Sequence, residues 1–171
     1  WVKCENLQRA GAIKFRGAAN AVMSLPESAV ARGVTTHSSG NHAAALTLAA
    51  SLRGMPATVV MPRGSNRAKM EAVRAYGGRI VECDPTQDAR EATVAQVVHD
   101  TGAELVPPFD DLRVIAGQAT AALELLEEVP SLDTVLAPVG GGGLLAGTCI
   151  STRGIAPGVA IYGAEPAAAD D

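Results

Sequence analysis

The amino-acid sequence predicts an α/β fold in which parallel twisted sheets are flanked by helices. Short runs of β-branched and apolar residues alternate with helical stretches of roughly 10 to 15 residues, the pattern of consecutive βαβ units. The 171 residues are 47% hydrophobic and only 3% aromatic, with 18 glycines, which favours closely packed helices joined by many turns. A chain of this length can bury a sizeable core.

The first expected βα units lie in the middle of the chain. The β-branched run 34–36 predicts a strand, and the alanine-rich stretch 41–52 that follows predicts a helix, because alanine is the strongest helix former. The apolar run 57–61 predicts the next strand. The stretch 66–76 predicts a helix that ends at the glycine pair 77–78.

The same alternation continues to the end of the chain. Further strands are expected at 79–83, 104–106, 134–139 and 159–163, and further helices at 88–100, at 111–128 and from Leu144 onward. The strand at 104–106 ends at two prolines, which cannot donate to a sheet. Ligands of such folds bind at the carboxyl ends of the strands, which directs attention to the loops 36–41, 61–65 and 139–143.

Charge and composition exclude several classes of function. With 14 Lys and Arg against 18 Asp and Glu, the formal net charge is −4, and no basic cluster predicts a nucleic-acid partner. No apolar stretch approaches the roughly 18 residues of a membrane span. The three cysteines are widely spaced, which predicts reduced, mostly buried thiols rather than disulfides or a zinc site.

Four consecutive glycines, Gly140, Gly141, Gly142 and Gly143, separate an expected strand from a helix that begins at Leu144. Without Cβ atoms the backbone can approach a ligand closely, and N–H groups at a helix N-terminus attract a phosphate. A tight turn that binds nothing is the plainer interpretation. The pattern Gly141-x-Gly143-x-x-Ala146, with Glu165 about 20 residues on, also fits the dinucleotide fingerprint of an NAD-dependent oxidoreductase.

Two further segments carry groups suited to chemistry. Lys14 lies among small and apolar residues with Arg16 nearby, and a desolvated lysine there could act as an amine nucleophile or base. The segment Ser38-Ser39-Gly40-Asn41-His42 joins a strand to a helix, where free N–H groups attract carboxylates. The plainer interpretations are a snorkelling lysine and a capping turn.

Taken together and in this order, the segments resemble the fold-type II pyridoxal-phosphate (PLP) enzymes, specifically the serine racemase and serine/threonine dehydratase (ammonia-lyase) family. The matching motifs are KCENLQ at 3–8, KFRGAAN at 14–20, SSGNH at 38–42, AGQ at 116–118, PVGGGG at 138–143 and EP at 165–166. The sequence departs from the family at Ala12-Ile13, where Ser-Phe is usual, and at Phe109, where mammalian-type racemases have Asn.

The resemblance implies a role for each matching residue. Lys14 would form the covalent bond to PLP and move the Cα proton of the substrate. Asn41 would hydrogen-bond the 3′-oxygen of PLP, and the cofactor phosphate would lie on Gly140, Gly141, Gly142, Gly143 and Leu144. The substrate carboxylate would bind to Ser38, Ser39, Gly40, Asn41 and His42.

The implied reaction is racemisation, β-elimination to a 2-oxo acid and ammonia, or both, on serine, threonine or a related β-hydroxy amino acid such as 3-hydroxyaspartate. Ser39 bears on this choice, because racemases of the family have a serine here, on the cofactor face opposite the lysine, whereas typical threonine dehydratases have Ala. An NAD-dependent oxidoreductase and a non-catalytic PLP-binding fragment are the alternatives.

The resemblance also implies a metal site, a domain division and an assembly. Glu165, the carbonyl of Ala169 and Asp171 would take Mg²⁺ or Mn²⁺, which prefer oxygen ligands. Residues 1–30 and 111–171 would belong to a large PLP-binding domain and residues 31–110 to a small α/β domain. We expect a cytoplasmic enzyme that forms a homodimer in its full-length form, with an amino-acid substrate and no nucleic-acid or membrane partner.

Overall fold

The computed structural model describes residues 1–168 and contains two parallel sheets. The first sheet has the order β3-β2-β1-β4, and the second pairs β5 with β6. The strands are β1 (Val34–His37), β2 (Ala57–Pro62), β3 (Arg79–Cys83), β4 (Glu104–Leu105), β5 (Thr134–Pro138) and β6 (Ala160–Ala164). The expected parallel α/β fold is therefore confirmed, with strand boundaries within two residues of the predictions.

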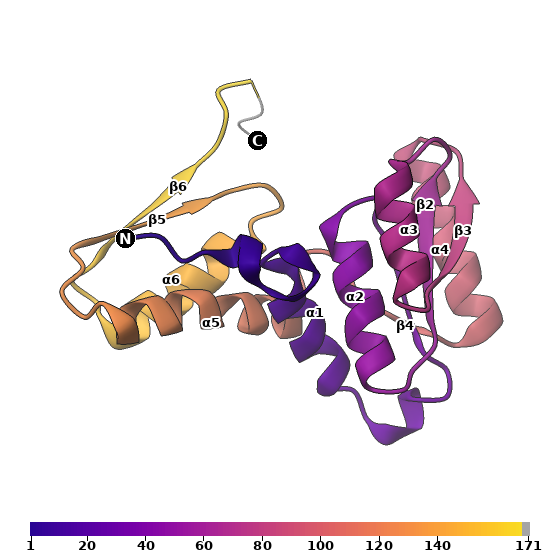
Figure 1. Cartoon of the computed structure of the whole chain (residues 1–171), viewed down its shortest axis with the longest axis horizontal. Coiled ribbons are helices and arrows are strands. Elements are labelled where there is room, and N and C mark those ends of the chain that lie inside the picture. Colours follow the sequence, from indigo (N-terminus) through magenta and orange to yellow (C-terminus); the bar gives the residue numbers. More distant parts are fainter. Residues whose placement is uncertain (169–171) are drawn as a thin grey trace.

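The helices form two groups around these sheets (Figure 1). They are α1 (Lys14–Met23), α2 (Asn41–Leu52), α3 (Arg67–Ala75), α4 (Gln87–Thr101), α5 (Leu112–Glu128) and α6 (Gly143–Ile155). Helices α2 and α3 lie on one face of the four-stranded sheet and α4 on the other, because the chain reverses direction along the sheet after β3. Helices α5 and α6 pack against each other beside β5 and β6.

Polar side chains fix where three of these helices begin. The Asn66 carboxamide oxygen accepts from the Ala68 amide at 2.9 Å, and the Thr86 hydroxyl accepts from the Ala89 amide at 3.2 Å. The Asp111 carboxylate accepts from the first-turn amides of α5, which shifts the start of that helix one residue past the prediction. Such caps satisfy N–H groups that have no partner within the helix.

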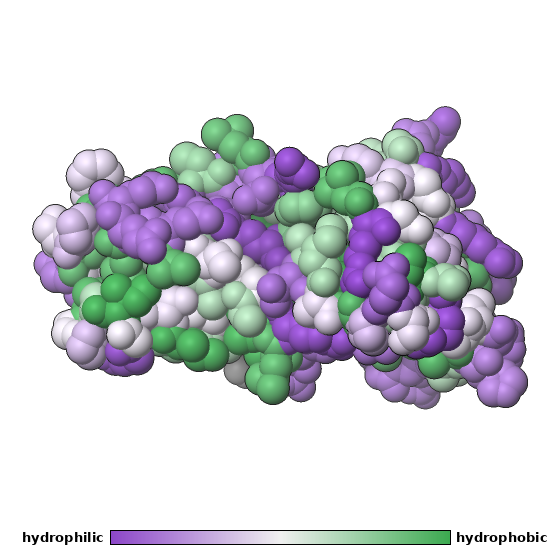
Figure 2. Space-filling model, turned by 90° about the horizontal axis from the view of Figure 1, so that it is seen from below, coloured by the Kyte–Doolittle hydropathy of each residue, from purple (hydrophilic) through white to green (hydrophobic). Residues whose placement is uncertain are grey.

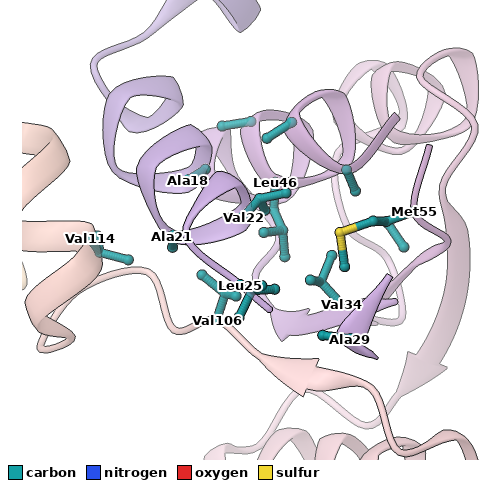
Figure 3. Packing of buried hydrophobic residues seen from close by; sticks show 14 residues of the cluster. Ala18, Ala21, Val22, Leu25, Ala29, Val34, Leu46, Met55, Val106 and Val114 are labelled. Carbon is teal, nitrogen blue, oxygen red and sulfur yellow. The ribbon is translucent and has the colours of Figure 1, made fainter. Parts of the chain in front are cut away.

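Helix α1 has no counterpart among the elements expected from the sequence. Its first turn lacks a capping side chain, and it contains Gly17 and Asn20, so its propensity signal is weak. Its apolar side is nevertheless buried in the largest core cluster, where Val22 and Ala21 lie with Leu46 of α2 and Val114 of α5 (Figure 3). Helix α1 therefore joins the two groups of helices, and packing rather than propensity stabilises it.

The face of the molecule seen in Figure 2 mixes apolar and polar residues along its whole length. No helix within residues 1–168 is long and apolar enough to cross a membrane. Of the three cysteines, Cys83 is buried, Cys149 is half-buried and Cys4 is exposed. The expectation of mostly buried thiols is therefore wrong for Cys4, which lies in the N-terminal segment before the first turn of helix.

Candidate active site

Lys14 is the first residue of α1, and its ammonium group lies at the junction between two halves of the molecule, one with the four-stranded sheet and one with β5, β6, α5 and α6. Its Nζ donates to the carbonyl of Pro108 at 2.7 Å, and the residue is half-buried. Burial lowers the pKa of Lys14, because removing a cation from water favours the neutral amine. The sequence suggested that nearby Arg16 would also lower this pKa. It does not, since Glu5 and Glu124 compensate the charge of Arg16. An amine of lowered pKa is suited to attack a carbonyl or to accept a proton.

The segment 38–42 lies at the carboxyl end of β1, where α2 begins. Gly40 occupies the N-cap position, and no side chain caps the helix. The Ser38 hydroxyl instead accepts from the Gly40 amide at 3.3 Å, whereas Ser39 and Asn41 are exposed. The uncapped N-terminus of α2 can accept an anion, and the exposed side chains of Ser39 and Asn41 stand next to it.

His42 belongs to the same segment, but its ring is buried away from this opening. Only 2% of the residue is exposed, and its Nε2 lies 3.0 Å from the carbonyl oxygen of Val106. Because a carbonyl accepts, Nε2 carries the proton. Burial, together with the nearby charge of Lys14, lowers the pKa of His42 to about 4, so the ring is neutral at physiological pH. Only the backbone amide of His42 is therefore suited to bind a substrate.

The glycine run joins β5 to α6 and is open on two sides. Gly142 caps α6 with φ +76°, a left-handed conformation that favours glycine. A Cβ at Gly140 or Gly142 would meet no atom within 4 Å, so the backbone there is accessible. The first helical hydrogen bond runs from Ala146 to Gly142, which leaves the N–H groups of the preceding turn available. This open helix N-terminus fits a phosphate group.

Residues 106–109, in the connection between β4 and α5, contact Lys14, His42 and the glycine run. Val106 accepts from His42, and Pro108 accepts from Lys14. The ring of Phe109 lies on Gly141, where a Cβ would approach its Cδ1 within 2.1 Å. Pro108 could not be identified from the sequence, because a backbone carbonyl acceptor carries no side-chain signal.

The proposed metal ligands are only partly within the described residues. Glu165 follows β6 and is exposed. Ala169 and Asp171 lie outside residues 1–168. Within that range no group of three or more His, Cys, Asp or Glu side chains comes together to hold a metal ion.

The chain is similar to known proteins over its whole length. A family model described as "Pyridoxal-phosphate dependent enzyme" matches residues 1–171. The chain is 54% identical over 169 residues to the beta-hydroxyaspartate dehydratase of Paracoccus denitrificans, and 48% identical to the serine racemase of Arabidopsis thaliana. These matches cover 99% of this chain and 54% and 51% of the relatives.

The fold of the chain also matches that of a solved structure. The serine racemase from Dictyostelium discoideum superposes with a TM-score of 0.96 at 47% identity, over 99% of this chain and 55% of that one. The chain thus spans about half the length of the relatives that it matches.

Proposed function

The chain belongs to the family of pyridoxal-phosphate-dependent enzymes, and from this premise we propose that the full-length protein racemises or β-eliminates a β-hydroxy amino acid. Serine, threonine and 3-hydroxyaspartate all carry the required hydroxyl group. One observation carries the proposal: the half-buried Lys14 amine and the glycine run contact the same short segment. Lys14 donates to the carbonyl of Pro108, and the ring of the next residue, Phe109, lies on Gly141.

Lys14 and the glycine run hold PLP in this proposal. The N–H groups from Gly140 to Leu144 would hold the phosphate at the start of α6, and the Lys14 amine, now hydrogen-bonded to the Pro108 carbonyl, would hold the cofactor at its other end. Asn41, exposed at the start of α2, donates to the 3′-oxygen. When bound, PLP supplies an electron sink that weakens the bonds to the substrate Cα.

The segment 38–42 binds and orients the substrate. The uncapped N-terminus of α2 and the Ser38 hydroxyl receive the carboxylate, and His42 contributes only its backbone amide because its ring is buried. Lys14 Nζ accepts the Cα proton on one face. Ser39 returns a proton on the other face in racemisation, whereas departure of the β-hydroxyl leads to a 2-oxo acid and ammonia.

The proposal extends to the domains, the metal site and the assembly of the full-length protein. Residues 31–110 form a small domain, and residues 1–30 with 111–171 contribute to a large one. Glu165, Ala169 and Asp171 hold Mg²⁺ or Mn²⁺ in this proposal, with Glu165 exposed and accessible to the ion. The enzyme works in the cytoplasm as a homodimer.

Replacing Lys14 tests the proposal directly. In the full-length protein, Lys14→Ala should lose the borohydride-trapped PLP adduct on this chain and nearly all release of pyruvate from serine. Lys69→Ala is the comparison variant, because the exposed Lys69 amine also lies beside Gly40 of the segment 38–42, and its removal should leave the adduct in place. An adduct that persists on another lysine in Lys14→Ala overturns the assignment. An adduct on Lys14 without turnover of any β-hydroxy amino acid supports the non-catalytic PLP-binding alternative instead.

A further inference from the structure

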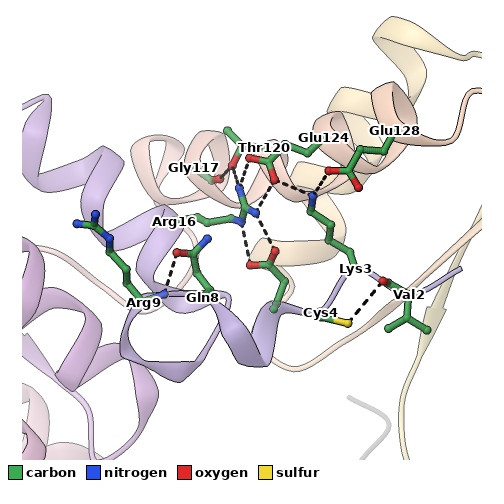
Figure 4. A network of polar contacts seen from close by, with 11 residues as sticks. Val2, Lys3, Cys4, Gln8, Arg9, Arg16, Gly117, Thr120, Glu124 and Glu128 are labelled. Carbon is green, nitrogen blue, oxygen red and sulfur yellow. Dashed lines mark hydrogen bonds and ion pairs between the residues drawn. The ribbon is translucent and has the colours of Figure 1, made fainter.

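Arg16, two residues after Lys14, donates from all five of its N–H bonds (Figure 4). It donates from Nε and Nη2 to Glu5, both at 2.8 Å, and from Nη1 and Nη2 to Glu124, both at 2.7 Å. The remaining Nη1 hydrogen reaches the Thr120 hydroxyl at 3.0 Å. Only 10% of the side chain is exposed, so this cluster is a fully satisfied guanidinium site.

The acceptors of Arg16 come from two separate parts of the chain. Glu5 lies in the N-terminal segment, and Glu124 lies on α5. Lys3 extends the cluster through ion pairs with Glu124 at 2.9 Å and Glu128 at 2.7 Å. Arg16 lowers the pKa of Glu124 to about 2, so the carboxylate stays ionised at neutral pH. The cluster therefore ties the first turn of α1 to α5 and to the N-terminal segment.

At the same level, α1 and α5 meet backbone to backbone. A Cβ on Gly117 would lie 2.4 Å from the Arg16 carbonyl oxygen and 2.6 Å from the Gly17 Cα. Helices normally fix their relative position by fitting side-chain ridges into grooves, and glycines provide none. One other polar contact joins the two helices, from Asn20 Nδ2 to the Arg113 carbonyl at 2.7 Å, and it is exposed. The Val114 side chain also packs over Gly17 at this contact, and the Arg16 cluster adds the buried polar constraint on the register.

The register of α1 against α5 decides where the Lys14 amine lies. Lys14 begins α1, and its acceptor Pro108 lies just before α5 on the segment that covers the glycine run. A slide by one helical residue is about 1.5 Å, enough to break the 2.7 Å hydrogen bond between them.

We propose that Arg16 is a positioning residue which, through Glu5 and Glu124, fixes the register of α1 and thereby aims Lys14 at the cofactor site. The inference rests on the proposed role of Lys14. Glu5 and Glu124 neutralise the Arg16 charge, so the effect comes from geometry rather than from a charge acting on the amine. A lysine at this position keeps the charge but cannot hold two carboxylates in a forked arrangement.

The test measures Lys14 itself in the cofactor-free full-length protein. Competitive labelling with a small acylating reagent over a range of pH gives the pKa of the Lys14 amine. In Arg16→Lys this pKa should rise toward that of an ordinary lysine, because a displaced amine regains water. Borohydride trapping of PLP on Lys14 at limiting cofactor should fall at least tenfold, with circular dichroism unchanged.

Arg53→Lys is the matched control: Arg53 follows α2, and its guanidinium contacts the other end of α1. Arg53 is 15% exposed in its side chain and donates to the carbonyls of Val22 and Leu25 at the end of α1. The Arg53→Lys variant should have a lower melting temperature and an unchanged Lys14 pKa. An equal change of the Lys14 pKa in both variants would mean that Arg16 only stabilises the helix, and an unchanged pKa in Arg16→Lys also overturns the proposal.

A milder variant covers the case in which Arg16→Lys does not fold. Glu124→Gln keeps the side-chain shape at a position that is 41% exposed, and should raise the Lys14 pKa by a smaller amount. If the Lys14 pKa does not rise in Glu124→Gln, the proposal is contradicted. If the wild-type protein forms no PLP adduct on Lys14 while Arg16→Lys still changes the labelling pKa, the proposed function fails and the positioning role stands.

Discussion

Burial lowers the pKa of two titratable side chains at the junction, Lys14 and His42, and they differ in what they can do. Lys14 has one hydrogen bond, to Pro108, and is only half-buried, so its amine can exchange that acceptor for a ligand. The His42 ring is fully buried, and its donor is committed to Val106. Lys14 is therefore suited to chemistry, whereas His42 joins α2 to the segment between β4 and α5.

Ser39 is the residue whose replacement separates the two proposed reactions. Racemisation needs a proton donor on each face of the substrate, whereas β-elimination needs only the lysine face. We expect Ser39→Ala in the full-length protein to reduce D-serine formation from L-serine at least about a hundredfold, with substantial pyruvate release, since acid–base groups contribute about 10²–10⁴-fold. The two products are measured in parallel from one reaction.

The structure also sharpens the interpretation of this variant. Gly40, not a serine, occupies the N-cap position of α2, and no side chain caps that helix. Ser39→Ala should therefore leave the melting temperature unchanged. A parallel loss of both products would contradict a role for Ser39 on one face only.

Among the elements, the connection from β5 into α6 shows that consecutive glycines have different structural reasons. Gly141 lies beneath the Phe109 ring, and Gly142 has a positive φ that strains any other residue. Gly140 has neither constraint, and a Cβ there would enter open space. Substitution at Gly140 therefore tests ligand binding without disturbing the turn.

Gly140→Asp places a negative charge where the proposed phosphate approaches the start of α6. Repulsion between the two anions should weaken PLP binding in the full-length protein at least tenfold, or about 1.4 kcal/mol. Cofactor titration by absorbance measures the change. Gly154→Asp adds the same charge near the other end of α6, also into open space, and should leave the affinity unchanged. Equal affinities in the two variants would place the phosphate elsewhere.

At the scale of the whole molecule, α1 and the segment 106–109 connect the two sheets. Helix α1 packs against both α2 and α5, and its buried residues belong to the largest core cluster. His42 and Lys14 hold the segment 106–109 through Val106 and Pro108. The proposed site therefore lies on the contacts that hold the two halves together, so its groups also affect the stability of the fold.

His42 makes this stability dependent on pH. Its pKa is about 4 in the folded protein against an ordinary value of 6.5, so between these values the unfolded chain binds a proton that the folded protein does not. Stability should therefore fall as the pH decreases from about 7 to 5, by about 2 kcal/mol, since each pKa unit corresponds to about 1.4 kcal/mol. Denaturant unfolding at several pH values measures this slope.

His42→Gln should flatten this slope, because glutamine retains an N–H donor for Val106 and does not titrate. His99→Gln is the control, since the His99 side chain is 83% exposed on α4. A steep slope that survives in His42→Gln would assign the effect to other groups.

The sequence by itself determined the order of the strands and of the helices other than α1, and the six motifs, the glycine run among them, that resemble those of PLP enzymes. These features depend on local propensity, turn chemistry and motif spacing, all of which are properties of neighbouring residues. Family membership and the parallel α/β fold follow from the same information and are confirmed. The roles of Lys14, Ser39 and the glycine run remain predictions.

Only the tertiary structure decided the contacts between distant segments. Helix α1 has a weak sequence signal and is stabilised by packing against α2 and α5. The Pro108 carbonyl that holds Lys14 is 94 residues away in sequence, and Glu124 is 108 residues from Arg16. Backbone acceptors and charge partners at such separations leave no local pattern, because their positions follow from how the helices pack.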